Sequence, residues 1–568
     1  MNSGFWGSES VKRLNGGSMC QKLSSDRKHA VASLENLYRI FTVPESPDST
    51  LGQIDAEISR NLTGFLQDHI VAVEKDLSVI ERDFSNPTIP EQPTFVSDYT
   101  DFLLKTLVAQ SVHTAAPGFV GHMTTALPYF ILPLSRIMTA LNQNLVKIET
   151  SKAFTPMERQ VLGMLHHLIY DRDAAFYEQW MHNRDAALGA FCSGGTVANF
   201  TALWVARNRL FPADDNFKGI AKEGFHKALR YYDCDGVAVL VSRRGHYSLG
   251  KAADLLGIGR DNLIPIATDD DNKIQLPALR REAERLRDAG IKLLSVIGVA
   301  GTTETGNVDP LEPMAEISQE FDCHFHVDAA WGGPTLFSRR HQHLLRGIDR
   351  ADSVTVDAHK QLYVPVGAGM VLFKDPNSPT SIEHHAEYIL RKGSKDLGSH
   401  TLEGSRPGMA MLVHSALQII GRQGYEILID QGIEKAQSFA RLIEADEDFE
   451  LISQPELNLL TYRYVPQQIQ RILAAAPAEM REAINNKLNQ LTKTLQKSQR
   501  AAGRTFVSRT KLEPTRYPGN RITVFRVVLA NPLTDDKTLA AILQEQKKLA
   551  ENGEARDRLE RVLQLIDN

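Results

Sequence analysis

The sequence predicts an α/β fold built on a mainly parallel, doubly wound β-sheet. Short apolar segments rich in β-branched residues alternate with longer segments of helical periodicity, which is the pattern of repeated strand–helix–strand units. Several of the apolar segments are followed directly by polar or glycine-rich turns. Because ligands bind at the carboxyl ends of the strands in such sheets, we expect these turns to meet at one edge and to form the site.

The length and composition are those of an ordinary globular protein with more than one domain. The chain has 568 residues, of which 42% are hydrophobic and 23% are charged, and its formal net charge is -5. This balance offers no basic excess for nucleic acid or for an anionic membrane surface. No apolar run is long enough to span a membrane, and residues 1–28 lack the apolar core of a signal peptide. We therefore expect neither nucleic acid nor a membrane as a partner.

The four cysteines, Cys20, Cys192, Cys234 and Cys323, stand far apart and form no CxxC pair. This spacing predicts neither a disulfide nor a metal site. It favours a reducing compartment, so we expect the protein to be cytoplasmic.

Four segments are expected along the chain. Residues 1–28 are polar and rich in glycine and serine, and we expect them to form a disordered lead. Residues 29–110 have helical spacing of apolar side chains and are expected to form an N-terminal helical segment. Strands and helices alternate over 111–375, which predicts the large ligand-binding domain. Residues 376–568 are expected to form a smaller α+β C-terminal domain.

The strands of the large domain are predicted from apolar runs at 236–242, 293–300, 323–327 and 366–373, with a further strand that ends at His359 and Lys360. A shorter apolar segment at 190–192 precedes an amphipathic helix. In the C-terminal part, the pattern predicts helices at 409–441, 467–502 and 537–551 and a strand at 521–529. Successive strands joined by helices imply right-handed crossovers.

Ser193, Gly194, Gly195 and Thr196 form the first of the polar turns. Glycine lets the backbone approach a ligand closely, and the start of the following helix offers free N–H groups and the positive end of its dipole. These features suit a phosphate group, although the segment matches neither a Walker loop nor a GxGxxG fingerprint. Taken alone, an ordinary capped start of a helix explains the segment equally well.

Lys360 stands just past the end of a buried strand, where an ammonium group is costly unless it is paired, solvated or used covalently. A lysine with cationic or apolar neighbours has a lowered pKa and can form a Schiff base with a carbonyl cofactor. For this residue by itself, an exposed loop lysine is the simpler explanation. The covalent explanation depends on what the rest of the chain supplies.

Asp328, Ala330 and His246 complete a site for a ligand that carries a phosphate, a pyridine ring and an aldehyde. Asp328 follows an apolar strand and would pair with the pyridine nitrogen, keeping it protonated so that the ring can accept electrons. Ala330 is small enough for a flat ring to lie against it, and His246 offers a planar face for stacking on the other side. The alternatives are a helix cap or surface carboxylate for Asp328 and a structural role for His246.

Together these motifs resemble the group II pyridoxal-phosphate-dependent amino-acid decarboxylases. The resemblance rests on Ser-Gly-Gly-Thr-x-Ala-Asn (193–199), His246, Gly-Thr-Thr-x-x-Gly (301–306), His-Val-Asp-Ala-Ala (326–330) and His-Lys (359–360). It implies pyridoxal 5'-phosphate as the cofactor and the PLP-dependent transferase-like fold, which is fold type I of aspartate aminotransferase. This fold has a mainly parallel seven-stranded sheet with helices on both faces, plus a smaller α+β C-terminal domain.

The resemblance also implies a role for each matching residue. Lys360 would hold the cofactor as a Schiff base and would carry the catalysis together with His246 and Asp328. The substrate would meet Arg406, whose planar fork suits a carboxylate, and also His122 and Thr124. The family forms homodimers with sites at the subunit interface, so we expect a homodimer here. The cofactor would further contact Gly194, Gly195, Thr196, Thr302, Ala330, Asp357 and His359.

Three segments, 117–125, 357–360 and 404–409, are most similar to family members that act on L-aspartate. The implied reaction converts L-aspartate to β-alanine and CO2 and would supply pantothenate and coenzyme A biosynthesis. Glutamate is one methylene longer, so a glutamate decarboxylase, or one for another acidic or diamino acid, is the alternative. An aminotransferase or lyase and a scaffold without activity are weaker alternatives, because the cofactor-stacking histidine, the lysine and the aspartate are all present.

Three residues are candidates for the proton donor of the last step. In some family members, a tyrosine on a mobile loop gives the proton that replaces the carboxylate. The matching segment here, 390–401, contains no tyrosine, although its glycine, serine and lysine content suits a mobile lid. The candidates are Tyr388, His246 and His400.

Overall fold

The computed structural model describes residues 77–386, 394–514 and 516–567, together with isolated positions between 48 and 56. The predicted lead 1–28 and most of the predicted helical segment before residue 77 lie outside these residues. By their contacts, the residues divide into two compact units, Met1–Ala116 and Pro117–Asn568. The described helices of the first unit are α5 (Leu77–Asp83), α6 (Val96–Thr106) and the 3-10 helix η1 (Val108–Gln110).

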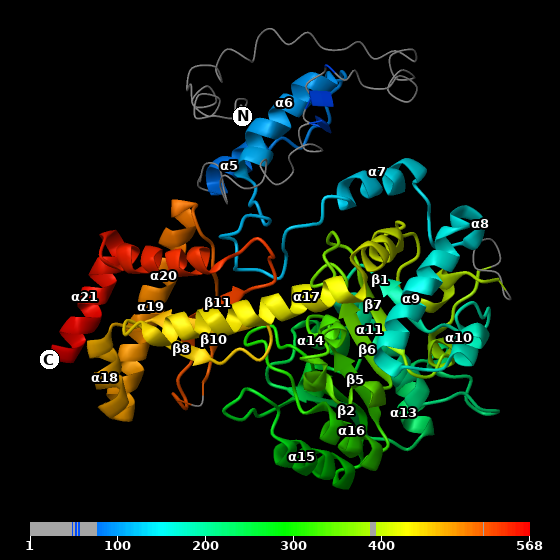
Figure 1. The fold of residues 1–568 in the computed structure, drawn as a ribbon. Coiled ribbons are helices and arrows are strands. Elements are labelled where there is room, and N and C mark those ends of the chain that lie inside the picture. The colour runs from blue at the N-terminus through cyan, green and yellow to red at the C-terminus, as the bar shows by residue number, and fades with distance from the viewer. Residues whose placement is uncertain are drawn as a thin grey trace. The chain divides into compact units, whose positions relative to one another are not determined.

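The second unit contains a seven-stranded sheet (Figure 1). Its strand order is β1-β7-β6-β5-β4-β2-β3, and only β7 runs against the direction of the others. The predicted mainly parallel sheet of seven strands is therefore confirmed. Its strands are β1 (Gly189–Cys192), β2 (Gly236–Ser242), β3 (Leu263–Ile266), β4 (Ile291–Val299), β5 (His324–Asp328), β6 (Ser353–Asp357) and β7 (Gly369–Phe373).

Helices cover both faces of this sheet, because the side chains of its strands alternate between two cores. In β2, Val237, Val239 and Val241 pack with α11 (Gly195–Leu210) and α14 (Ser248–Leu255), whereas the intervening Ala238 and Leu240 face the other core. That second core is covered by α9 (Phe154–Tyr170), α15 (Leu276–Asp288) and α16 (Leu311–Glu320). The remaining helices of this part are α7 (Ile131–Leu141), α8 (Ile148–Ser151), α10 (Ala174–Trp180), α12 (Ile220–Glu223) and α13 (Phe225–Tyr231).

The C-terminal part has a second, smaller sheet. The long helix α17 (Ala410–Ala445) contacts α9 at the large sheet and β8 in the small one, and it is interrupted at Gly421, where φ is 68°. The small sheet has the strand order β10-β11-β9-β8 and is antiparallel throughout. The smaller α+β part is thus confirmed. Its elements are β8 (Phe449–Ser453), β9 (Leu459–Tyr464), α18 (Gln467–Ala475), α19 (Ala478–Ala502), β10 (Ser508–Leu512), β11 (Ile522–Val528), α20 (Asp536–Ala550) and α21 (Gly553–Asp567).

Two features of the large sheet differ from the sequence-based expectation. Strand β3 was not predicted, because it has four residues, includes Pro265 and lies at the edge of the sheet, where apolar patterning is weak. The strand predicted at 366–373 begins only at Gly369, because Val366 is exposed and Gly367 has a φ of 110° that no regular strand adopts. The division into segments at 28, 110 and 375 stays a prediction.

Candidate active site

The turn after β6 carries Lys360. Its Nζ lies 3.0 Å from Asp357 Oδ2, and the other carboxylate oxygen of Asp357, Oδ1, is buried without a hydrogen-bond partner. The backbone N–H of His359 donates to the carbonyl of Ala368, and the ring Nδ1 lies 2.8 Å from the same oxygen. Nδ1 therefore carries the proton of a neutral ring, and Nε2, which is 3.8 Å from Asp357 Oδ2, is free to accept. The lysine is paired rather than exposed to solvent alone.

The start of α11 lies against this turn. A side chain at Gly195 would place its Cβ 2.8 Å from Asp357 Oδ2, and one at Gly194 would lie 3.3 Å from a ring carbon of His359. Only glycine allows this approach, so the backbone N–H groups at the start of a 16-residue helix are presented next to the lysine turn. The structure thus brings the predicted phosphate cradle, including Thr196 in the first turn of the helix, together with Lys360.

Asp328 is the last residue of β5, and Ala330 lies in the turn that follows. Asp328 is buried, and its Oδ1 accepts a hydrogen bond from the backbone N–H of Ala330 at 3.2 Å. Its Oδ2 accepts one from Asn199 Nδ2 at 2.9 Å. Ala330 lies beside the start of α11, since a Cβ at Gly195 would be 3.3 Å from its methyl group. The carboxylate is therefore fixed by two donors from two different elements.

His246 follows β2 and is held by Ser248. Two donors are directed at its Nδ1, namely the hydroxyl of Ser248 at 2.8 Å and the backbone N–H of Ser248 at 3.3 Å. Burial lowers the pKa of His246, the negative charge of Asp328 opposes this shift and the positive charge of Lys360 adds to it. The ring is therefore neutral at neutral pH and carries its proton on Nε2.

A chain of buried polar side chains continues behind Asp328. His326 Nε2 lies 3.1 Å from Asn199 Oδ1, and His326 Nδ1 lies 2.8 Å from the hydroxyl of Ser353. The same hydroxyl lies 2.7 Å from His324 Nε2. Burial lowers the pKa of His326 to about 4, so its ring is neutral. The sequence analysis included Asn199 and His326 in its motifs without assigning either a role, and only their positions in space reveal the chain.

Comparison with known proteins gives this arrangement its family. Residues 81–465 match the family model described as the pyridoxal-dependent decarboxylase conserved domain. The chain belongs to the pyridoxal-dependent decarboxylase family. This decarboxylase is 61% identical, over 93% of its length and 97% of the relative, to an aspartate 1-decarboxylase of Aliivibrio fischeri. It is 29% identical to an L-2,4-diaminobutyrate decarboxylase of Rhizobium meliloti, over 65% of this chain and 69% of the relative.

A solved structure supports the same assignment. The crystal structure of mouse CSAD in apo form superposes with a TM-score of 0.75 at 25% identity, covering 88% of this chain and 98% of that one. The protein is accordingly a carboxy-lyase that uses pyridoxal 5'-phosphate and acts on an amino acid. The family resemblance inferred from the sequence is confirmed.

The residues present fit this cofactor. The glycines at the start of α11 leave backbone N–H groups open to a phosphate, next to the ring of His359. Lys360 lies next to these N–H groups, because both Lys360 and Gly195 adjoin Asp357. Asp328 presents a buried carboxylate whose hydrogen bonds come from neutral donors. Thr302 differs from the other predicted cofactor contacts, because its hydroxyl forms a hydrogen bond within its own turn, 2.8 Å from the hydroxyl of Thr305.

Two of the buried arginines of this decarboxylase, Arg406 and Arg526, differ in their partners. Both terminal nitrogens of Arg406 donate to the carboxylate of Glu158 at 2.7 Å, so its planar fork is filled by an internal partner. Arg526, on β11, donates through Nε to the carbonyl of Thr303 at 2.5 Å, and its Nη1 lies 3.5 Å from the hydroxyl of Ser508. Neither contact uses Nη2. Arg526 was missed by the sequence analysis, because nothing in a strand pattern marks an arginine as facing a site.

His122 and Thr124 lie on a segment beside β10. Their side chains contact each other, with Thr124 Oγ1 3.4 Å from His122 Nδ1. Burial lowers the pKa of His122, and the positive charges of Arg526 and Lys360 lower it further. His122 therefore lies within electrostatic reach of both the reactive lysine and the arginine of the C-terminal part. The predicted substrate contacts of His122, Thr124 and Arg406 stay predictions.

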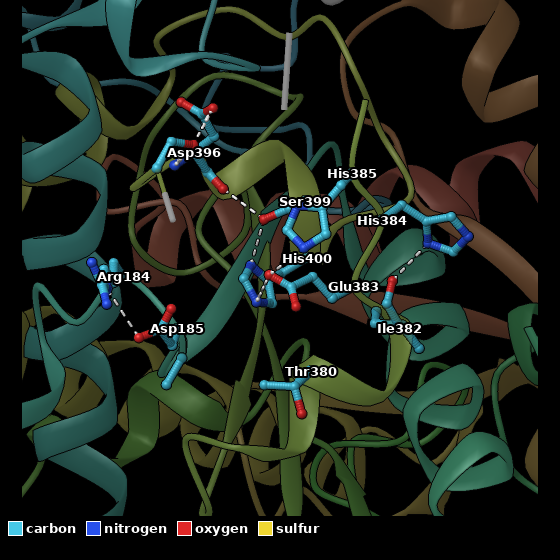
Figure 2. A network of polar contacts seen from close by, with 12 residues as sticks. Arg184, Asp185, Thr380, Ile382, Glu383, His384, His385, Asp396, Ser399 and His400 are labelled. Atoms are coloured by element: carbon cyan, nitrogen blue, oxygen red, sulfur yellow. Dashed lines mark hydrogen bonds and ion pairs between the residues drawn. The ribbon is translucent and has the colours of Figure 1, made fainter. Parts of the chain in front are cut away.

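Figure 2 shows the polar network around His400. His400 Nδ1 lies 2.8 Å from the hydroxyl of Ser399, and Nε2 lies 3.7 Å from Glu383 Oε1. Burial, followed by the charges of Arg159 and His385, lowers the pKa of His400 to about 4. Such a ring is uncharged at neutral pH and is a poor acid there, which disfavours His400 as the proton donor.

Among the described residues, no group of three or more His, Cys, Asp or Glu side chains could hold a metal ion. No helix within the described ranges combines the length and the apolar character that crossing a membrane requires. Tyr388, the third candidate for the proton donor, lies outside the described residues.

Proposed function

We propose that this decarboxylase removes the α-carboxylate of L-aspartate. The bond between Cα and the carboxylate carbon breaks, CO2 leaves, and one proton is added at Cα, which gives β-alanine. The observation that carries this proposal is the 61% identity, over 93% of the chain, to a relative named aspartate 1-decarboxylase. The β-alanine would supply pantothenate and coenzyme A biosynthesis.

Lys360, Asp328 and His246 divide the catalytic work in this proposal. When bound, pyridoxal phosphate supplies an electron sink for the bond that breaks. Lys360 would hold the cofactor through its aldehyde. Asp328 would keep a proton at the pyridine nitrogen. His246 and Ala330 would lie against the ring and would help to keep water from the reacting atoms.

The phosphate is assigned to the start of α11. Gly194, Gly195 and Thr196 would donate backbone N–H groups to it, and His359 would add a ring contact. Asp357, which pairs with Lys360 at 3.0 Å, would keep the lysine turn in place while the lysine exchanges with substrate. These assignments rest on the adjacency of the two turns.

Arg526 is the group that we assign to the carboxylate of the substrate. It is buried, and its contacts with Thr303 and Ser508 do not use Nη2. Its positive charge lowers the pKa of His122, which lies nearby. Aspartate carries two carboxylates, and His122 with Thr124 would meet the second one. Arg406 is a less suitable ligand, because Glu158 already fills its fork.

A competition experiment tests the substrate. Purified protein with added pyridoxal phosphate is offered aspartate, glutamate, diaminobutyrate and cysteine sulfinate in one mixture, and the amines formed are identified. β-Alanine as the dominant product supports the proposal. γ-Aminobutyrate as the dominant product would show that glutamate is the substrate instead. Glutamate is longer than aspartate by one methylene, and a binding site discriminates between two such substrates by only about 1–3 kcal/mol.

The assembly and location form a separate part of the proposal. We propose a cytoplasmic homodimer whose sites lie at the subunit interface, as the family resemblance implies. Light scattering of the purified protein would show twice the mass of the 63.3 kDa chain. A monomer of full activity would contradict the shared site.

A further inference from the structure

Asn199 lies at a branch point of the buried hydrogen bonds in the site. Its side-chain nitrogen Nδ2 donates to Asp328 Oδ2 at 2.9 Å and to the hydroxyl of Ser248 at 3.1 Å. Its oxygen Oδ1 faces His326 Nε2 at 3.1 Å. The side chain is almost fully buried, with 1% of its surface exposed, so no solvent can replace these partners.

The orientation of the Asn199 amide follows from its partners. A carboxylate can only accept, so the atom that faces Asp328 must be the nitrogen. The oxygen then faces His326, whose Nε2 must carry a proton in order to donate to it. Nδ1 of a neutral His326 is an acceptor, and the hydroxyl of Ser353 satisfies it at 2.8 Å. A flipped amide would direct two oxygens at each other across 2.9 Å.

The second hydrogen of the Asn199 amide determines the direction of the next bond. Because the Ser248 hydroxyl oxygen accepts from Asn199, its own hydrogen is free to donate, and the nearest acceptor is His246 Nδ1 at 2.8 Å. The backbone N–H of Ser248 points at the same nitrogen from 3.3 Å. With two donors directed at Nδ1, the single proton of a neutral His246 must be on Nε2.

We infer that Asn199 is a positioning residue that orients the Asp328 carboxylate and, through Ser248, sets the tautomer of His246. This inference rests on the proposed roles of Asp328 and His246 and deepens them. One amide thereby couples Asp328, the proposed partner of the pyridine nitrogen, to His246, the proposed stacking residue. Because both hydrogens come from the same nitrogen, neither contact can shift without disturbing the other.

The proton on His246 Nε2 gives this arrangement a chemical consequence. A neutral histidine with this tautomer presents an N–H donor on the side away from Ser248, while Nδ1 is held by its two donors. The opposite tautomer would present a lone pair there and would repel a carboxylate. Fixing Nε2–H therefore makes His246 a hydrogen-bond donor towards an anionic substrate.

Two substitutions separate the two arms of this network. Asn199→Ala removes both donated bonds, so we expect pyridoxal phosphate to bind about tenfold more weakly, and the Nε2–H tautomer of His246 to be less populated because the Ser248 hydroxyl is no longer oriented. Ser248→Ala leaves Asp328 with its donor and removes the shorter of the two bonds to His246 Nδ1, leaving the backbone N–H at 3.3 Å, so cofactor affinity should stay within about threefold while the population of the Nε2–H tautomer falls. Ser248→Thr, which keeps the hydroxyl, should restore the tautomer.

A matched control lies on the same helix. Asn208 is also buried in α11, but its amide donates to the carbonyl of Ser381 and not into the site. Asn208→Ala should change neither cofactor affinity nor the His246 signals. This control separates loss of a buried amide from loss of the positioning contacts.

The measurements are made on the full-length enzyme without amino acid. Cofactor affinity is obtained by titrating the cofactor-free protein with pyridoxal phosphate, and the tautomer is obtained from the 15N signals of labelled histidine, with His246 assigned by its loss in His246→Phe. A Ser248→Ala protein whose Nε2–H population equals that of the parent would overturn the inference, as would an Asn199→Ala protein that matches the parent in both measurements.

The same variants also give a kinetic readout. For Ser248→Ala, KM for the amino acid should rise about threefold or more, because His246 then donates to the anionic substrate less often, although Arg526 and His122 are untouched. Since affinity and tautomer are measured without any substrate, failure of the aspartate assignment leaves the inference about Asn199 testable. Conversely, an unaltered tautomer in these variants says nothing against aspartate as the substrate.

Discussion

Arg406 and Arg526 are both buried arginines, but only Arg406 has a carboxylate that fills its fork. In Arg406, two hydrogen bonds of 2.7 Å to Glu158 satisfy both terminal nitrogens. Arg526 is held through a backbone carbonyl and a hydroxyl, and burial lowers its pKa to about 10. A guanidinium that is desolvated without a carboxylate partner is stabilised by any anion that reaches it.

Replacing Arg526 therefore tests substrate binding directly. Arg526→Lys keeps the charge but loses the planar fork, so we expect KM for the amino acid to rise about tenfold or more while the protein remains folded. Initial rates over a range of aspartate concentrations give KM and kcat separately. An unchanged KM would remove Arg526 from the substrate site.

Glu158→Gln is the contrasting substitution. It leaves the buried charge of Arg406 without its partner, so the free energy of unfolding should fall by about 3–5 kcal/mol. Urea denaturation followed by fluorescence measures this loss. If KM for aspartate rose instead and stability were kept, the carboxylate contact would belong to Arg406.

Lys360→Ala tests the covalent role. The variant should lose turnover and should gain no mass when pyridoxal phosphate and borohydride are added, because Lys360 is the only lysine paired with Asp357 within the described residues. Intact mass spectrometry reads the result, and a lysine outside the site, Lys292, provides the control substitution. Retained turnover would contradict the proposed mechanism.

Asp328→Asn tests the partner of the pyridine nitrogen. The amide can still accept from Asn199 or Ala330, so the cofactor should bind, but it cannot stabilise a proton on the ring. We expect kcat to fall at least about 100-fold, which corresponds to losing a charged hydrogen bond of about 3 kcal/mol. A rate equal to that of the parent would exclude Asp328 from this role.

At the scale of elements, the two reactive turns are joined to the C-terminal part by a closed ring of hydrogen bonds. Trp331 Nε1 donates to Asn458 Oδ1 at 3.0 Å, Asn458 Nδ2 donates to Gln361 Oε1 at 2.7 Å, and Gln361 Nε2 donates to the carbonyl of Trp331 at 2.7 Å. Tyr363 has a left-handed φ of 58°, and its hydroxyl donates to the carbonyl of Ala530. The lysine turn is thus held in a costly conformation from outside the large sheet.

Asn458→Ala should loosen this turn. The substitution leaves the Trp331 N–H and the Gln361 oxygen buried without partners, at a cost of about 1–3 kcal/mol for each. We expect lower stability and slower attachment of pyridoxal phosphate to Lys360, followed by absorbance after mixing. Asn485, a buried asparagine of the small domain that bonds Arg463, offers the control variant Asn485→Ala. Equal attachment rates in both variants would contradict this role of the ring.

Sequence patterns predicted most elements, and their limits have physical causes. The central strands could be predicted because both their faces are buried, which leaves continuous apolar runs such as 236–242. Strand β3 is short and lies at the edge, so it leaves no such run. Site residues at or just past the end of a strand, such as Asp328 and Lys360, could be identified from their position. Asn199, Ser248 and Arg526 could not, because their roles arise from contacts between distant segments.

At the scale of the whole molecule, buried histidines make folding sensitive to acid. Burial lowers the pKa values of His166, His326 and His400 to about 4, below the usual 6.5. In the unfolded chain these histidines take up protons near pH 6.5, whereas in the folded protein they do not. Their contribution to the free energy of unfolding is therefore complete above pH 6.5 and is lost as the pH falls towards 4. Burial raises the pKa of Asp309 to about 7, which opposes this trend over a similar range.

The three histidines outnumber the single carboxyl group of Asp309, so we expect the free energy of unfolding to decrease when the pH is lowered from 7.5 to 5. The midpoint of urea unfolding at the two values measures the effect. In His166→Gln, which keeps a donor for the carbonyl of Phe373, the decrease should be smaller. A midpoint that rose on acidification would show that Asp309 dominates.

The ring of Trp331, Gln361 and Asn458 also sets an order for the biogenesis of the enzyme. Lys360 leaves the ribosome well before Asn458, and the backbone of Asn458 is in turn held by the N–H of Leu529, near the end of the chain. A nascent chain therefore contains the reactive lysine long before Asn458 is available to stabilise the turn that carries it. Cofactor loading is expected to follow synthesis of residue 529, and chains that terminate before residue 458 would have the lysine without the residues that position it.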